Sequence, residues 1–173
     1  MNEVIRAIKE RRSIRAYKNE QITDAQLDAI LEAGAYAASG MGKQATVIVP
    51  VQDPEVIAMM SGLNAKVMGM DIDPFYGAPT VVVVFANAEE TATPVEDGSL
   101  VIGNMMLAAF SEGVDSCWIH RAKEVFETEA GKALKAKWGI GEGFVGIGNC
   151  ILGYRDGDLP PAPERKPGRI VRV

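Results

Sequence analysis

Residues 79–87 read PTVVVVFAN, an uninterrupted run rich in β-branched apolar side chains. Valine favours extended backbone, and a strand that is apolar on both faces must be covered on both sides. The run therefore predicts a central strand of a sheet with helices packed against each face. It is far shorter than the roughly 20 apolar residues that a membrane-spanning helix needs.

Further strands and a long helix are predicted on both sides of this run. Upstream, residues 45–51 (ATVIVPV) have the composition of a second strand. Downstream, residues 94–112 predict a helix that is apolar nearly all round, which would bury it on both sides and in part against a partner chain. Residues 115–120 and the glycine-bearing residues 144–154 predict two more strands.

Helix starts are marked by capping residues at three points. Asn2 precedes a first, amphipathic helix. Thr23 and Gln26 have the spacing of a capping box and open a second helix, which would run to about residues 38–40. Asp53-Pro54 combines an N-cap with a first-turn proline and opens a third helix.

The last third of the chain changes character. Residues 122–138 predict a helix interrupted near Gly131, whereas the proline-rich residues 156–173 cannot form a regular helix. The final residues 169–173 (RIVRV) alternate like a strand. Helices and strands are thus mixed without strict β-α-β alternation. This pattern predicts a single α+β domain over residues 1–173, with a central mixed or antiparallel sheet wrapped by helices.

The composition excludes several classes of function. A formal net charge of −5 argues against bulk nucleic-acid binding. His120 is the only histidine and the two cysteines, Cys117 and Cys150, stand in apolar runs without CxxC spacing, so we expect buried thiols and no metal site. The polar amphipathic N-terminus does not resemble a signal peptide, and we expect a soluble, cytoplasmic protein without a membrane partner.

The most informative chemical pattern is Arg11-Arg12-Ser13-Ile14-Arg15. Forked guanidinium donors with a hydroxyl between them suit a phosphate monoester. The alternative is a solvated basic helix end. A second basic cluster, around Arg165-Lys166, would add charge to the same anion, or it is a solvated tail.

Two other segments have both a functional and an ordinary interpretation. In residues 38–44 (ASGMGKQ) small side chains would let the backbone approach a planar ligand, or they form a helix C-cap. In residues 116–121 His120 could act as an acid or base, or it is an ordinary surface histidine. No Ser-His-Asp arrangement can be built, and Gly146, Gly148 and Gly153 do not open a helix as a dinucleotide-binding loop would.

The order of these segments resembles the nitroreductase family. The resemblance is carried by IKERRSIRAY (residues 8–17), AASGMGKQA (37–45), Asp97 with NMMLAA (104–109) and GVDSCWI (113–119), and finally ILGY (151–154) followed by RKP (165–167). It implies an FMN-binding α+β fold and an intimate homodimer with active sites at the interface. The C-terminal tail would be exchanged between the two subunits.

The resemblance also assigns residues to the flavin site. Arg11, Ser13 and Arg15 would hold the phosphate and ribityl chain, with Arg12 contributing mainly backbone. Ser39, Gly40 and Met41 would line the flavin edge from the other subunit, and Gln44 would lie near the ring. Ile119, His120 and Arg121 would bring backbone amides near flavin N5 and O4. From the tail, Arg165 would reach the phosphate, with Lys166 as a weaker candidate.

The chain departs from the family pattern in the second motif. The family's Pro-Ser is Ala38-Ser39 here, its Asn is Gly42, its Ser is Lys43, and its Pro-Trp is Ala45-Thr46. One side-chain contact to the flavin ring is therefore lost. We hypothesise that Lys43 replaces it with a cation near the N1/O2 edge.

The predicted function is that of an FMN-dependent oxidoreductase without a catalytic side chain. Hydride would pass from NADH or NADPH to flavin N5, and a nitroaromatic, quinone-like or other small organic acceptor would be reduced in a ping-pong order. The main alternative is an FMN-binding storage or regulatory flavoprotein without nicotinamide turnover. A related reductive enzyme on the same fold stays open, and a phosphate- or nucleic-acid-binding module using the N-terminal arginines alone is a more remote possibility.

Overall fold

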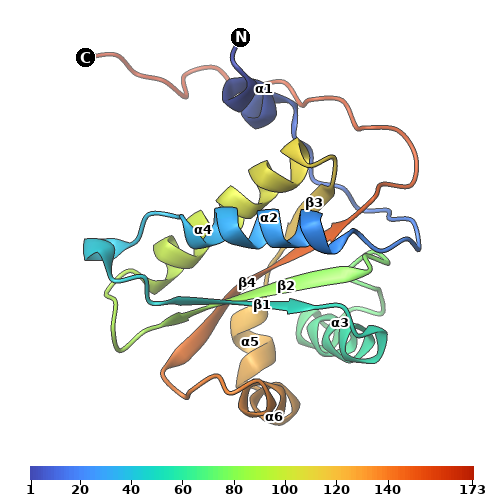
Figure 1. The fold of residues 1–173 in the computed structure, drawn as a ribbon, viewed down its shortest axis with the longest axis vertical. Helices are drawn as coiled ribbons and strands as arrows, with labels where there is room; N and C mark the ends of the chain where they lie inside the picture. Colours follow the sequence, from blue (N-terminus) through green and yellow to red (C-terminus); the bar gives the residue numbers. More distant parts are fainter.

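The computed structural model describes residues 1–173 and contains one four-stranded sheet (Figure 1). Its strands are β1 (Thr46–Val51), β2 (Thr80–Asn87), β3 (Asp115–Ile119) and β4 (Phe144–Gly153), in the order β1-β2-β4-β3. All neighbours are antiparallel. Every residue of β2 is buried, which confirms the expected central strand and the α+β class. The sheet is antiparallel rather than mixed.

One face of the sheet is covered by α2 (Asp24–Ala35) and α4 (Pro94–Ser111). Val82 and Val84 of β2 point to this side and pack with Ile102 and Met105 of α4. Each such side chain contributes about 1.5–3 kcal/mol when it leaves water. The all-apolar composition of β2 is therefore explained by a core on this face and a second core on the other.

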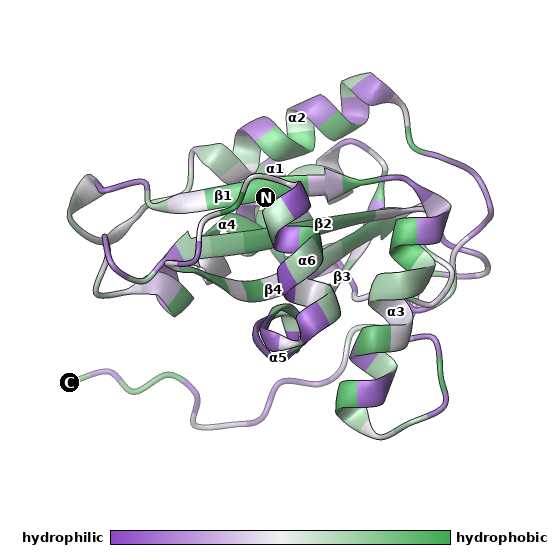
Figure 2. Cartoon of the chain, turned by 90° about the horizontal axis from the view of Figure 1, so that it is seen from below, coloured by the Kyte–Doolittle hydropathy of each residue, from purple (hydrophilic) through white to green (hydrophobic).

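The opposite face is covered by α3 (Pro54–Met68), α5 (Ala122–Glu127) and α6 (Glu129–Lys137). Here the alternate β2 residues Val81, Val83 and Phe85 form the core, and the Phe85 ring meets the Phe126 ring edge to face at 4.8 Å. Figure 2 shows the hydrophobic strands between helices that alternate hydrophobic and hydrophilic turns. The sheet is thus the shared wall of two cores.

The capping predictions hold, and two helix boundaries differ. Thr23 and Gln26 form the capping box of α2, but α2 ends at Ala35, before the predicted residues 38–40. The predicted interruption near Gly131 is present but falls three residues earlier, at Thr128, whose extended backbone ends α5 and whose hydroxyl accepts from Gly131 N–H at 3.0 Å. Gly131 lies inside α6, and a larger residue does not fit there because its Cβ would overlap the Val125 carbonyl.

The two ends of the chain lie outside the sheet and its helices. The first helix, α1 (Glu3–Glu10), is capped by Asn2 as predicted, yet Val4, Ile5 and Ile8 are exposed, and only Ala7 is buried. Residues 155–173 are exposed throughout and run as an extended arm (Figure 1). The predicted strand at residues 169–173 does not form in the single chain, where no strand lies beside it.

Candidate functional site

The N-terminal basic segment is fixed by backbone pairing to the sheet. Ser13 and Ser116 form a parallel bridge in which Ile14 N–H donates to the Ser116 carbonyl at 3.1 Å. Further along, Lys18 N–H donates to the Tyr154 carbonyl at 2.8 Å. Residues 13–18 therefore run beside the start of β3 and the end of β4, and the arginines at their N-terminal side are held at this edge.

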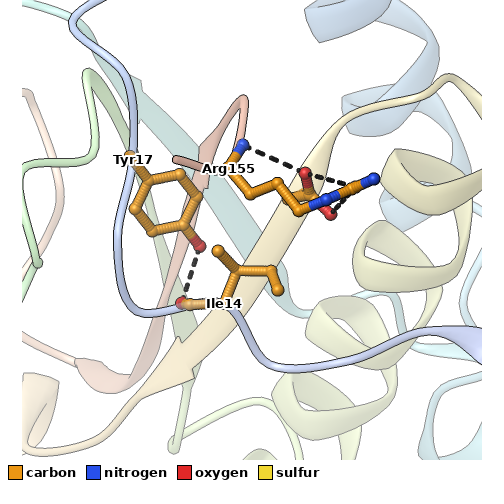
Figure 3. Close-up of polar contacts among 4 residues, drawn as sticks. Ile14, Tyr17 and Arg155 are labelled. Carbon is orange, nitrogen blue, oxygen red and sulfur yellow. Dashed lines mark hydrogen bonds and ion pairs between the residues drawn. The ribbon is translucent and has the colours of Figure 1, made fainter. Parts of the chain in front are cut away.

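A side-chain cluster locks the same segment (Figure 3). The Tyr17 hydroxyl donates to the Ile14 carbonyl at 3.0 Å, and Arg155 binds Asp115 through its backbone N–H and its guanidinium, each at 3.1 Å. Burial raises the pKa of the Tyr17 phenol well above its ordinary value, so the hydroxyl stays a proton donor. Tyr17 packs tightly on Gly153, where a Cβ would lie 2.9 Å from the ring.

This anchoring brings the two basic clusters to one cavity of about 340 Å³. The cavity has no acidic residue in its lining, which consists of Arg11, Arg12, Ser13, Arg15, Pro160, Pro161, Pro163 and Arg165. Lys166 does not line it. The prolines of the tail restrict its backbone, and Arg165 belongs to the same lining as the N-terminal arginines.

Two guanidinium nitrogens of the lining arginines have no acceptor within the chain. Arg11 Nη1 and Arg12 Nε are both buried and make no hydrogen bond within the chain. Arg12 Nη1, in contrast, donates to the carbonyls of Lys9 and Arg11 at 2.9 and 2.8 Å, which fixes its side chain along the backbone. The basic lining without an acidic residue fits a phosphate group, whose oxygens accept charge-assisted bonds from forked guanidinium groups.

Residues 39–44 form a tight loop at the other end of α2. The loop contains the 3₁₀ turn Gly40–Gly42, and both Met41 and Gln44 have positive φ angles, 55° and 52°. Ser39 Oγ closes it by accepting from Gln44 N–H at 3.0 Å. Two non-glycine residues in the left-handed region indicate backbone strain that the surroundings maintain.

Asp97 is the residue that holds this loop. Its buried carboxylate accepts from Gly40 N–H at 2.8 Å and from the Thr91 and Thr93 hydroxyls at 2.9 and 3.0 Å. Burial by itself would raise the pKa of Asp97, but these three hydrogen bonds to the ionised form bring the pKa below its ordinary value. The sequence analysis gave Asp97 no role, because Glu96 and Asp97 together look like an ordinary acidic first turn of a helix.

Lys43 makes a different contact from the one hypothesised. Its Nζ donates to the Glu90 carbonyl at 2.7 Å, which attaches the loop to the segment that follows β2. In the single chain the ammonium therefore supports the loop. Whether it also reaches a flavin edge remains a prediction.

One chain does not bring the loop and the basic cavity together. Residues 39–44 follow the C-terminal end of α2, whereas the segment of residues 11–18 lies toward its N-terminal end (Figure 1), and the 12 residues of α2 span about 18 Å. A ligand that contacts the arginines and residues 39–44 at once would therefore take the loop from a second copy of the chain.

Two asparagine side chains donate hydrogen bonds to the backbone of the turn between β3 and α5. Asn149 Nδ2 donates to the Ile119 carbonyl at 3.3 Å, and Asn64 Nδ2 donates to the His120 carbonyl at 3.0 Å. Arg121 follows with φ 74°, and the His120 side chain is exposed. Sequence reasoning named Ile119, His120 and Arg121 but missed both asparagines, although each stands in a largely apolar run.

The two thiols lie in the interior and do not line the cavity. Cys117 and Cys150 are free and buried, which confirms the expectation, and burial raises the pKa of Cys150 to about 12. No three His, Cys, Asp or Glu side chains gather closely enough to hold a metal ion. None of the helices combines the length and the apolarity needed to cross a membrane.

These features define an α+β protein with an arginine-lined anion cavity beside an antiparallel sheet. The chain belongs to the nitroreductase family, because the model of that family, described as "Nitroreductase family", matches residues 8–154. The match runs from the N-terminal basic segment through the end of β4.

Individual relatives agree with this assignment. An Archaeoglobus fulgidus protein, provisionally named an NADH dehydrogenase/NAD(P)H nitroreductase, is 33% identical over 99% of this chain and 98% of its own length. A nitroreductase of Bacteroides fragilis, solved with bound FMN, is 33% identical with a TM-score of 0.91 and full coverage of both chains. An FMN-bound nitroreductase of Desulfitobacterium hafniense is 28% identical with a TM-score of 0.89, over 100% of this chain and 99% of that one.

Proposed function

We propose that this protein is an FMN-dependent oxidoreductase that works as a homodimer. The observation that carries the proposal is the cavity lined by arginine donors and by no acidic residue. A phosphate monoester supplies the acceptor oxygens that these donors lack. The FMN-bound relatives favour FMN over other phosphate esters.

Each part of the site has a separate task. Arg11, Ser13 and Arg15 bind the phosphate and ribityl chain, Arg12 aligns the backbone, and Arg165 approaches from the tail. Lys166 adds long-range charge without lining the cavity. Ile119, His120 and Arg121 present their backbone to the ring. The ring's far edge takes Ser39, Gly40, Met41, Lys43 and Gln44 from the second copy, because one chain keeps that loop at the opposite end of α2.

Bound FMN would supply the two-electron chemistry, accepting hydride from NADH or NADPH and reducing a nitroaromatic, quinone-like or other small organic acceptor in a second half-reaction. The chain's own part is binding, orientation and electrostatic adjustment of the cofactor. We assign no catalytic side chain, because the thiols are buried and the single histidine is exposed beside the turn rather than paired with a nucleophile.

The decisive experiment is the visible spectrum of the purified protein, recorded anaerobically before and after NADH and after NADPH. We expect oxidised-flavin bands that a nicotinamide bleaches, and FMN as the cofactor released on denaturation. Bound FMN that neither nicotinamide reduces would favour the storage or regulatory alternative. A protein that takes up no FMN would overturn the proposal.

Steady-state kinetics test the order of the two half-reactions. Double-reciprocal plots of the initial rate at several acceptor concentrations should give parallel lines for the ping-pong order, and intersecting lines would refute that order.

A matched pair of arginine variants tests the cavity itself. Arg11→Met removes a buried donor and should weaken FMN binding about 10- to 100-fold, since a hydrogen bond to a charged group contributes about 1.5–3 kcal/mol. Arg6→Met makes the same charge change on the exposed surface of α1, outside the cavity lining, and should leave the Kd unchanged. Equal losses in both variants, measured by fluorescence titration, would indicate a general charge effect instead.

A further inference from the structure

The turn between β3 and α5 presents two backbone N–H groups in a fixed direction. All peptide bonds of the chain are trans, so each carbonyl and the N–H of the next residue point to opposite sides of their peptide plane. Asn149 holds the Ile119 carbonyl and Asn64 holds the His120 carbonyl. The N–H groups of His120 and Arg121 therefore point away from the two asparagines.

These two N–H groups are free within the chain. Neither the His120 nor the Arg121 amide donates to a backbone or side-chain acceptor. The Arg121 backbone is also in the left-handed region, at φ 74° and ψ 16°, which costs a non-glycine residue about 1–2 kcal/mol. A strained turn with two unpaired donors persists only where its surroundings hold it.

Both asparagines are buried in the interior of the fold. Asn64 on α3 is 1% exposed, and Asn149 on β4 is 2% exposed. Each uses its amide nitrogen on the turn and leaves Oδ1 buried without a partner. A buried unsatisfied acceptor destabilises the fold by about 1–3 kcal/mol. Two such positions, from two different elements and converging on consecutive carbonyls, are poorly explained as ordinary packing.

We propose that Asn64 and Asn149 are positioning residues that hold the His120 and Arg121 amides toward an acceptor edge of the cofactor. The inference rests on the proposed FMN function and deepens it. Two donors on consecutive residues suit adjacent acceptors such as N5 and O4 of an isoalloxazine ring. The asparagines act through the backbone and touch no cofactor atom themselves.

The test uses the full-length protein with Asn64→Ala, Asn149→Ala and the matched control Asn104→Ala. Asn104 also donates its Nδ2 to a backbone carbonyl, that of Ala33 at 3.1 Å, but joins α4 to α2 away from the turn. The first readout is the backbone NMR signals of His120 and Arg121 in the cofactor-free protein. We expect them to shift toward ordinary right-handed or extended values in the first two variants and not in the control.

The second readout is the infrared C4=O stretch of bound FMN carrying ¹³C at C4, together with the FMN Kd. We expect the stretch to rise and the Kd to increase about tenfold in Asn64→Ala and Asn149→Ala, while Asn104→Ala matches the wild type. An unchanged stretch in variants that still bind FMN would overturn the inference and leave the proposed function intact. A wild type that binds no FMN would overturn the proposed function, and with it the assigned cofactor edge, while the NMR signals still decide whether the asparagines hold the turn.

Discussion

At the scale of single residues, buried polar groups decide how the site is shaped. Asp97 is enclosed by α4 and its preceding loop, and it holds residues 39–44 through one backbone N–H and two hydroxyls. Arg11 and Arg12 keep donors buried and unpaired. An unpaired polar group in the interior is unfavourable, so these positions mark where the fold gives up stability for a binding geometry.

Asp97→Asn should remove a pH-dependent part of the stability. Because the folded-state pKa of Asp97 lies below its unfolded value of about 3.9, the ionised carboxylate stabilises the fold above that value, and this stabilisation is lost as the pH falls through the folded-state pKa. We expect Asp97→Asn to lower the melting temperature by about 5 °C at pH 7. The difference in melting temperature between Asp97→Asn and the wild type should become smaller below about pH 3. A gap that stays constant from pH 7 to pH 2.5 would contradict this role.

Gly40→Ala should disturb the loop by steric overlap alone. A Cβ at Gly40 would overlap the Thr93 hydroxyl and crowd the Thr91 hydroxyl, so it would displace the N–H that Asp97 accepts. We expect a loss of about 1–3 kcal/mol in the free energy of unfolding, measured by urea denaturation. Gly42→Ala meets no neighbour but has φ 66°, and should show the smaller effect of backbone strain only. The reverse order of the two losses would exclude the steric explanation.

At the scale of elements, glycines set how closely β4 approaches its neighbours. Gly146 receives the first turn of α5, since a Cβ there would lie 2.6 Å from the Ala122 backbone. At Gly148 a Cβ would likewise lie 2.9 Å from the Trp118 ring. The β4 glycines thus allow close packing rather than forming a dinucleotide-binding loop, and Gly146 accommodates the helix that follows the candidate turn.

Gly146→Ala should therefore destabilise the protein and displace α5. The added methyl group meets backbone, which cannot move as a flexible side chain can, and we expect a loss of about 1–3 kcal/mol by chemical denaturation. In α3, Gly62→Ala meets no atom within 4 Å and should stabilise the protein by up to about 1 kcal/mol through helix propensity. A stabilising Gly146→Ala would show that α5 is not seated as described.

At the scale of the whole molecule, one chain leaves apolar surface uncovered. Val4, Ile5 and Ile8 of α1 are exposed, and Leu100 of α4 is 50% exposed although its helix is apolar nearly all round. The tail from residue 155 onward packs against no core. The proposed homodimer would cover the exposed helix faces and the tail, and it would bring residues 39–44 of one copy to the cavity of the other.

Leu100→Glu should weaken self-association without unfolding the chain. The residue lies on the outer face of α4, so a carboxylate there is harmless to a monomer and costly inside an interface between copies. We expect the dimer dissociation constant to rise at least tenfold in sedimentation velocity experiments. Met59→Glu, on the exposed face of α3, is the matched control and should leave the mass unchanged. A monomeric wild type at micromolar concentration would refute the dimer.

Removal of residues 168–173 tests the contribution of the tail. If residues 169–173 add a strand to a partner's sheet, their main-chain hydrogen bonds are lost on deletion, and the dimer dissociation constant should rise. The cavity keeps Arg165, so FMN binding by any remaining dimer should persist. An unchanged dissociation constant would argue against tail exchange.

The sequence by itself determined the features that depend on neighbours in the chain. The apolar run of residues 79–87 gave the central strand, and Thr23 with Gln26 gave a helix start, because propensity, periodicity and capping act over a few residues. Only the tertiary structure decided that Arg165 lines the same cavity as Arg11, that Asp97 holds Gly40, and that Asn64 and Asn149 meet at one turn. Each of these contacts joins segments dozens of residues apart or more, and their pairing follows from how the helices pack on the two faces of the sheet.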